Sequence, residues 1–311
     1  MNASTRIVKA NGLDMRIVEE GKGPLLLLCH GWPELSYSWR HQIPVLAAAG
    51  YRVVAPDMRG YGGTSAPEAI DAYTIHHLVG DMVALVAELG ETQATIIGHD
   101  WGAIVAWQCA MFRPDVFPAV VAMSVPLGRR APARPLDILK QQGVSTFYWQ
   151  YFQEPGIVEA EFARDWSHSL RAIYYGTGLG LLLKPGRGMV EDAKIPEKPP
   201  AWISDDEIAH YVKEFSRTGL RGGINWYRNI DRNWDLTAPW QDAKIHQPAL
   251  FIAGAKDPVI TGLIGEKSVQ TLQEIVPGLR KKVIIDGAGH WIQQEKPQEV
   301  NAAVLEFLKG L

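Results

Sequence analysis

Short apolar runs recur along the chain, and each is bounded by turn-forming residues. They are apolar at nearly every position, which is typical of strands buried on both faces of a parallel sheet. The pattern predicts six such strands, at residues 25–30, 51–57, 94–99, 120–125, 249–255 and 282–288. Segments with helical spacing lie among them, at residues 76–90, 103–112 and 297–310. This alternation predicts an α/β fold with a mostly parallel central sheet flanked by helices.

A hairpin precedes this pattern, and an insertion interrupts it. RIVKA and LDMRIVEE flank Asn11-Gly12, a strong hairpin signal. Residues 128–237 contain helical patterns and proline breaks but no convincing strand. We therefore predict a core of residues 1–127 and 238–311, with an inserted α-helical cap at 128–237. Within the cap, Ser204 and Glu207 form a capping-box signal, and residues 176–188 are expected to be a glycine-rich loop.

Composition narrows the class of partner. The 311 residues are 47% hydrophobic and 21% charged with a net charge of −3, so nothing favours nucleic acid. No apolar stretch is long enough to span a bilayer, and the N-terminus lacks a signal-peptide core. Cys29 and Cys109 lie in apolar segments and are expected to be buried free thiols, which fits a cytoplasmic setting. We expect no membrane association and a monomer or homodimer.

Aromatic residues are concentrated in the predicted cap. Many of the 11 Trp and 10 Tyr fall between residues 145 and 240. They indicate either an aromatic-lined apolar pocket or a small additional core beneath a lid, and composition does not separate these.

The stretch GHDWGA, residues 98–103, follows a predicted strand and precedes a predicted helix. This is the setting of a nucleophile elbow, in which Gly98 and Gly102 permit a sharp, closely packed turn. The residue at the nucleophile position is Asp100. A helix N-cap is the alternative role for an aspartate at this position.

Two downstream residues favour the catalytic interpretation. Asp257 in AGAKDPV and His290 in DGAGHWI each follow a predicted strand. The chain order nucleophile, acid, histidine is that of the α/β-hydrolase triad. The ends of the predicted strands are also where open α/β sheets place their sites.

The loop HGWP, residues 30–33, follows the strand at 25–30. In this architecture it supplies one backbone N–H of an oxyanion hole, and the residue after the nucleophile supplies the other. The predicted donors are the N–H groups of Trp32 and Trp101. His30 and His99 are expected to shape loops, and Asp57 with Arg59 to hold the turn at 56–65.

A carboxylate nucleophile points to a particular kind of reaction. It is ionised at neutral pH and can displace a leaving group at saturated carbon, which gives an ester with the enzyme. His290, oriented by Asp257, would then activate the water that attacks this ester. No cofactor or metal is needed. A halide leaving group requires N–H donors and an epoxide oxygen requires acidic O–H donors, for which 147–156 and 225–234 offer tyrosines.

The chain resembles the soluble epoxide hydrolases of the α/β-hydrolase superfamily along nearly its whole length. The matching stretches are HGWP, GHDWG, YWQYFQEPG, NWYRNIDRNW, KDPV and GHWIQQEKP. The resemblance implies that Tyr148 and Tyr227 bind and protonate the oxygen of a small apolar epoxide, giving a vicinal diol. Tyr151 is the alternative to Tyr148.

Two other functions stay open on the residues alone. A haloalkane or haloacid dehalogenase would use the same Asp100, His290 and Asp257. A ligand-binding protein on the hydrolase fold would bind an epoxide without turnover.

Overall fold

The computed structural model describes residues 3–178, 180–262 and 265–311. They contain one eight-stranded sheet with the order β1-β2-β4-β3-β5-β6-β7-β8. The strands are β1 (Ser4–Ala10), β2 (Leu13–Gly21), β3 (Leu25–Cys29), β4 (Arg52–Pro56), β5 (Thr95–His99), β6 (Ala119–Met123), β7 (Ala249–Gly254) and β8 (Leu279–Ile285).

The sheet is mostly parallel, as predicted. β1 pairs antiparallel with β2, and β2 pairs antiparallel with β4. All other neighbours, from β4 through β3 to β8, run parallel. Asn11 and Gly12 both have positive φ, 50° and 76°, which is the two-residue hairpin turn that the sequence predicts.

Two hydrophobic layers cover the sheet. α2 (Ile75–Glu88), α3 (Trp101–Phe112) and α12 (Gly265–Ile275) contribute to one layer, and α1 (Ile43–Ala48) and α14 (Pro297–Lys309) contribute to the other. β3, β6 and β7 are buried along their whole length, which explains their uninterrupted apolar runs. The remaining short elements of the core are η1 (Ser36–Trp39), η2 (Ile70–Tyr73), η3 (Ala238–Trp240), α11 (Pro258–Thr261) and α13 (Ile292–Glu295).

The last strand differs from the prediction. β8 covers Leu279–Ile285 rather than 282–288. It lies at the edge of the sheet, and several of its residues are exposed, among them Arg280 and Lys281, which a search for apolar runs excludes. It ends before Gly287, whose φ of 75° turns the chain.

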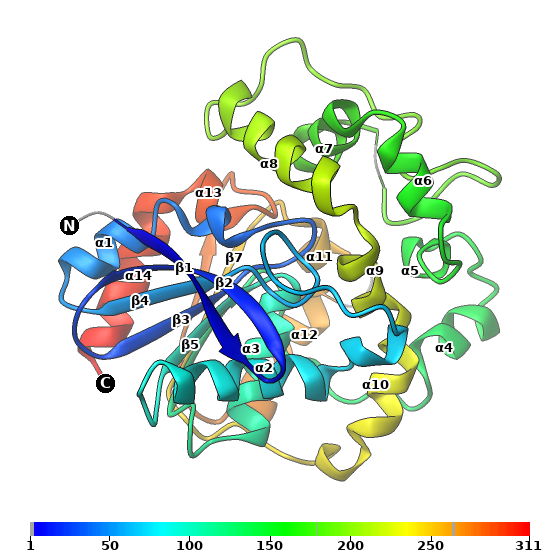
Figure 1. The fold of residues 1–311 in the computed structure, drawn as a ribbon. Helices are drawn as coiled ribbons and strands as arrows, with labels where there is room; N and C mark the ends of the chain where they lie inside the picture. The colour runs from blue at the N-terminus through cyan, green and yellow to red at the C-terminus, as the bar shows by residue number, and fades with distance from the viewer. Residues whose placement is uncertain (1–2, 179, 263–264) are drawn as a thin grey trace.

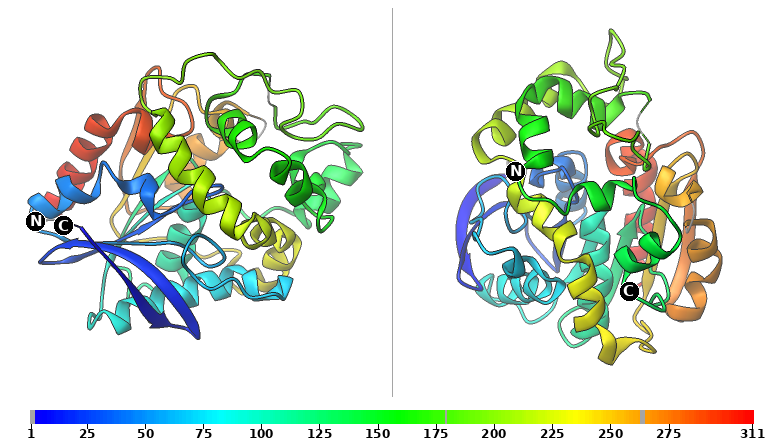
Figure 2. Two further views of the ribbon diagram at one scale, coloured as in Figure 1. Left: turned by 45° about the horizontal axis from the view of Figure 1, so that its top comes forward. Right: turned by 90° about the vertical axis from the view of Figure 1, so that its right-hand side faces the viewer.

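The segment between β6 and β7 is helical, as predicted. It contains α4 (Pro135–Gln141), α5 (Tyr148–Tyr151), α6 (Ile157–Ala163), α7 (Trp166–Tyr175), α8 (Asp205–Thr218), α9 (Arg221–Arg228) and α10 (Ile230–Leu236). Apart from isolated bridges, its described residues include no strand. Figures 1 and 2 show these helices gathered on one side of the sheet. We call this segment the cap; its boundaries at 128 and 237 stay a prediction.

Two details of the cap match the sequence. Ser204 and Glu207 form the predicted capping box at the start of α8. The glycine-rich stretch 176–188 has no helix in its described residues, and residue 179 of that prediction lies outside them.

Both cysteines are buried and free, as expected. None of the helices in the described residues combines the length and apolar character needed to cross a bilayer.

Candidate active site

Asp100 lies at a sharp turn between β5 and α3. Its φ of 53° and ψ of −120° are unusual for a residue with a side chain, a strain that nucleophile elbows share. A Cβ on Gly98 would stand 2.0 Å from the Gly102 carbonyl oxygen, and one on Gly102 would stand 2.0 Å from the Cys29 carbonyl oxygen. Both glycines are therefore required by close backbone packing, as the sequence predicts.

The Asp100 carboxylate does not act as a helix cap. It makes no capping hydrogen bond to α3. Its Oδ1 instead accepts a hydrogen bond of 2.8 Å from the Trp32 N–H, and its Oδ2 lies 3.5 Å from His290 Nε2. Within the described residues, the Trp101 N–H makes no hydrogen bond to Asp100. Trp32 is thus the one of the two predicted oxyanion donors that contacts the carboxylate.

Asp257 and His290 meet at the same edge of the sheet. Asp257 is fully buried and caps α11, accepting a 2.8 Å bond from the Val259 N–H. Both its carboxylate oxygens lie 3.0 Å from His290 Nδ1. Burial raises the pKa of Asp257, but His290 outweighs this and the pKa is lowered. Burial likewise lowers the pKa of His290, but Asp257 and Asp100 outweigh it and hold the pKa well above its ordinary value.

The backbone of His290 is held as firmly as its ring. Its carbonyl oxygen accepts a 2.9 Å bond from Ser124 Oγ and lies 2.8 Å from His99 Nε2. Ser124 follows β6 directly and has a φ of 67°. Sequence analysis missed Ser124, because a serine after a strand carries no signal of its own.

Tyr148 and Tyr227 are neighbours in the wall of the cavity. Tyr148 is the first residue of α5 and Tyr227 lies in α9, and their rings are 5.7 Å apart. Both line the same cavity as Asp100. Burial and, among other groups, the negative charge of Asp100 raise both phenol pKa values, so the hydroxyls stay protonated.

Tyr151 lies elsewhere. Its hydroxyl donates a 2.9 Å hydrogen bond to Glu161, and it is not among the residues lining the cavity with Asp100. Of the two tyrosines, only Tyr148 lines the cavity that Asp100 lines.

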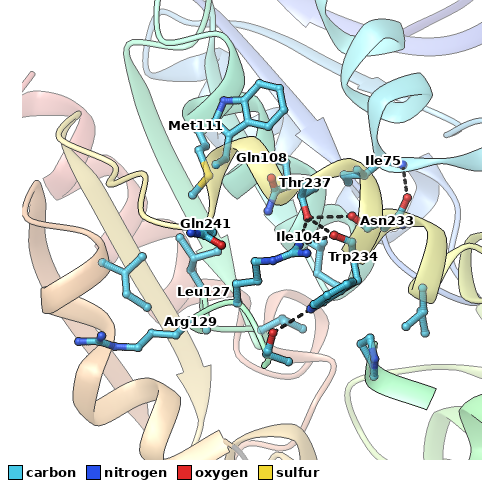
Figure 3. A pocket seen from close by; sticks show the side chains of 18 of the residues that line it. Ile75, Ile104, Gln108, Met111, Leu127, Arg129, Asn233, Trp234, Thr237 and Gln241 are labelled. Atoms are coloured by element: carbon cyan, nitrogen blue, oxygen red, sulfur yellow. Dashed lines mark hydrogen bonds between the residues drawn. The ribbon is translucent and has the colours of Figure 1, made fainter. Parts of the chain in front are cut away.

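The cavity has a volume of about 810 Å³. It extends along α3 past Ile104, Gln108 and Met111 to residues of α10 (Figure 3). Other cap aromatics, such as Trp226 and Phe215, are buried in the core. The aromatic residues of the cap therefore serve both purposes: some line the cavity, and others form a buried core.

The loops around the site are held by buried polar groups. Asp57 accepts hydrogen bonds from the Ser36 and Gly63 N–H groups, so it does hold the turn at 56–65. Arg59, which lies in the same turn, joins it to α2 through a buried ion pair with Asp81. In the described residues no three His, Cys, Asp or Glu side chains are grouped as metal ligands.

Glu34 was missed by the sequence analysis. It follows HGWP directly and is fully buried behind the triad, where His99 contacts it. The only signal in the sequence that could have drawn attention to Glu34 is its position directly after HGWP, and nothing in the sequence indicates that it is buried.

Comparison with known proteins shows the family to which the chain belongs. The profile of the alpha/beta hydrolase fold family matches residues 24–297. Epoxide hydrolase A of Mycobacterium tuberculosis is 48% identical, over 100% of this chain and 99% of that protein. Epoxide hydrolase 2 of Siraitia grosvenorii is 38% identical over 97% of each.

Solved structures show the same likeness. Epoxide hydrolase A from Mycobacterium thermoresistibile superposes with a TM-score of 0.94 at 46% identity, covering 100% of this chain and 99% of that one. An epoxide hydrolase from Vigna radiata gives 0.94 at 41%, covering 99% and 98%. The chain belongs to the α/β-hydrolase fold family and, within it, to the epoxide hydrolases, an enzyme family.

Proposed function

We propose that the protein adds water to a small apolar epoxide and releases a vicinal diol, through an ester formed on Asp100. The observation that carries this proposal is the position of Asp100. Its carboxylate lies 3.5 Å from His290 Nε2, and it lines the same cavity as Tyr148 and Tyr227 of the cap.

The first step is attack on saturated carbon. Asp100 Oδ1 is bound by the Trp32 N–H, which leaves Oδ2 to form the new bond to an epoxide carbon. The carbon–oxygen bond of the ring breaks, and the departing oxygen takes a proton from Tyr148 or Tyr227. The high phenol pKa values keep these protons available in the resting site.

The second step returns the enzyme to its starting state. His290 Nε2 removes a proton from water, and the resulting hydroxide attacks Asp100 Cγ. Negative charge develops on Oδ1, where the Trp32 N–H and, after a small shift, the Trp101 N–H stabilise it. The ester bond breaks and the second diol oxygen leaves with the proton from His290. The proton that remains on the Asp100 carboxyl, the second proton of the water, returns to the tyrosinate and restores the carboxylate.

The pair of phenols supports an epoxide over a halide. A halide leaves without a proton and gains little from O–H donors in particular, whereas an alkoxide needs one. Tyr148 and Tyr227 line the same cavity as Asp100, which supports their role as donors to an epoxide oxygen bound there. The dehalogenase alternative predicts halide release that persists without these hydroxyls.

A single-turnover reaction in oxygen-18 water tests the ester. With enzyme in excess, both oxygens of the first diol are expected to be of natural isotope, because one comes from the epoxide and one from Asp100. The heavy isotope is expected in the Asp100 peptide after digestion. A first diol already carrying heavy oxygen would exclude the ester route.

A further inference from the structure

A second buried acid–histidine pair lies directly behind the triad. Glu34 and His99 are both fully buried, and Glu34 Oε2 lies 2.7 Å from His99 Nδ1. Neither reaches the cavity. The steps proposed above use neither residue, so the chain buries two groups able to carry charge for which the reaction itself gives no reason.

The hydrogen bonds of His99 define its protonation state. Its Nδ1 faces the Glu34 carboxylate, and its Nε2 lies 2.8 Å from the carbonyl oxygen of His290. A carboxylate and a peptide carbonyl both accept hydrogen bonds and have no proton to donate. Both ring nitrogens must therefore donate, and a histidine that donates from both nitrogens is an imidazolium cation.

The contacts of Glu34 require the matching negative charge. Besides His99, it accepts hydrogen bonds from the Gly31 N–H at 2.9 Å and from the side-chain amides of Gln293 and Gln294 at 2.9 and 3.1 Å. Four donors surround its two oxygens. Burial raises the pKa of Glu34, but the attraction of His99 leads the effects that outweigh it, and the pKa lies at about 2.

His30 shows that this arrangement is specific. It is also fully buried beside the site, yet its Nδ1 lies 2.9 Å from the Gly31 carbonyl and its Nε2 accepts a bond from the Met58 N–H. One nitrogen donates and the other accepts, so His30 is neutral. Burial alone therefore does not impose a double-donor histidine in this region.

We propose that the Glu34–His99 ion pair is a positioning device that joins the oxyanion loop to the catalytic histidine. Glu34 fixes the Gly31 N–H, one residue before the Trp32 donor, and Gln293 and Gln294 just after His290. His99 fixes the His290 carbonyl. The inference deepens the proposed function, since it takes His290 as the base.

The pair also acts on the charge of His290. The groups facing that ring are Asp257, Asp100 and His99, whose ring centre is 4.9 Å away. Glu34 lies on the far side of His99. The nearer positive charge opposes protonation of His290 and partly offsets the two carboxylates.

Nitrogen-15 spectroscopy of the free enzyme tests the cation without any turnover. At about pH 8 most histidines are neutral, and in labelled protein each of these shows one protonated ring nitrogen. We expect two residues to show two protonated ring nitrogens: His290, whose pKa Asp257 and Asp100 raise, and His99, whose signal tests the inference. Glu34→Gln should remove the signature of His99, and Glu34→Asp, which keeps the carboxylate, should retain it. A spectrum in which His99 has an unprotonated nitrogen overturns the inference.

Kinetics tests the positioning role. In Glu34→Gln we expect His99 to lose its proton and one of its two hydrogen bonds. Ester hydrolysis should slow by about 10-fold or more, as when the hydrogen-bond partner that orients a histidine is lost in metal sites. The acid limb of the pH–rate profile for ester hydrolysis should move to higher pH, because the loss of the cation nearest His290 raises the pKa of His290. Glu34→Asp should restore most of the rate.

Asp81→Asn is the matched control. It also neutralises a buried carboxylate, paired with Arg59 away from the triad, so any general loss of stability is shared. We expect the acid limb of the pH–rate profile for ester hydrolysis to lie at the same pH in this variant as in the parent enzyme. An equal shift in both variants, or none in Glu34→Gln, overturns the positioning role. Failure of the proposed function is distinct, because it would abolish diol formation in the parent while leaving the imidazolium signature intact.

Discussion

The sheet side and the cap side of the site are built differently. Asp100, Asp257 and His290 each follow a parallel strand closely, so the sheet brings them to one edge. Tyr148 and Tyr227 come from cap helices and are held by aromatic contacts, such as that of Tyr227 with Trp101 at 5.1 Å. The sheet side carries the charged groups and the cap side carries neutral donors. In the mechanism proposed above, this difference corresponds to a division of labour: the sheet side forms and hydrolyses the ester, and the cap side donates a proton to the leaving oxygen.

Removing the sheet-side nucleophile should have the largest effect. Asp100→Asn keeps the shape and the acceptor for the Trp32 N–H but removes the carboxylate. We expect a loss of about 10⁴-fold or more in kcat, comparable to removing a nucleophile from other triads. Diol formation measured by chromatography checks this, with intact mass confirming that the amide persists. Activity within about tenfold of the parent would mean that Asp100 is not the nucleophile.

Replacing the base should separate the two steps. In His290→Gln the carboxylate is still present, so alkylation should continue while ester hydrolysis slows by about 10³-fold to 10⁴-fold. One equivalent of epoxide should be consumed, and the protein mass should rise by the mass of the epoxide. If the variant turns over at the parent rate, or consumes no epoxide although it is folded, the assignment of His290 to the second step is wrong.

Changes on the cap side should alter alkylation instead. Each of Tyr148→Phe and Tyr227→Phe should slow it by about 10-fold to 100-fold, and the double variant by more, because the alkoxide then lacks both proton donors. Rapid mixing with enzyme in excess measures this step. Unchanged alkylation in the double variant, or halide release from a haloalkane, would favour the dehalogenase alternative.

Tyr151→Phe is the matched control for the cap. It removes the same hydroxyl three residues along the chain, where the bond is to Glu161 rather than into the cavity. We expect alkylation to change by less than about threefold, since a hydrogen bond outside the cavity contributes mainly to stability. A loss as large as that of Tyr148→Phe would restore Tyr151 as the alternative donor.

The sheet side was predictable from the sequence because its information is local. Uninterrupted apolar runs predict buried strands, and the residues that follow parallel strands lie at the same end of the sheet. The sequence alone therefore predicted that Asp100, Asp257 and His290 lie close together. β8 was misplaced because an edge strand does not need an apolar run. Glu34 escaped notice because burial of a charged side chain depends on partners distant in the chain, such as Gln293.

The cap side could not be predicted in the same way. Residues alone did not choose between its tyrosines, because all lie in aromatic-rich segments and any of them could pack in a core. It was the resemblance to a known family that singled out Tyr148 and Tyr227. The contact of Tyr151 with Glu161, which separates Tyr151 from Tyr148, joins two helices and leaves no pattern in either one.

The last prediction concerns pH and follows from the charge difference between the two sides. In the free enzyme Asp257 and Asp100 outweigh burial and raise the pKa of His290. Alkylation neutralises Asp100 and removes one of these two charges, so the His290 pKa should be lower in the ester than in the free enzyme. Hydrolysis needs neutral His290, so its rate should fall about tenfold per pH unit only below that lowered pKa. Stopped-flow decay of the ester gives one value, and nitrogen-15 titration of the free enzyme gives the other. Alkylation should not fall in parallel with hydrolysis. Coincident values, or a parallel fall in the two rates, would show that Asp100 and His290 are not coupled through the ester, and the distinction between a charged sheet side and a neutral cap side would lose its mechanistic meaning.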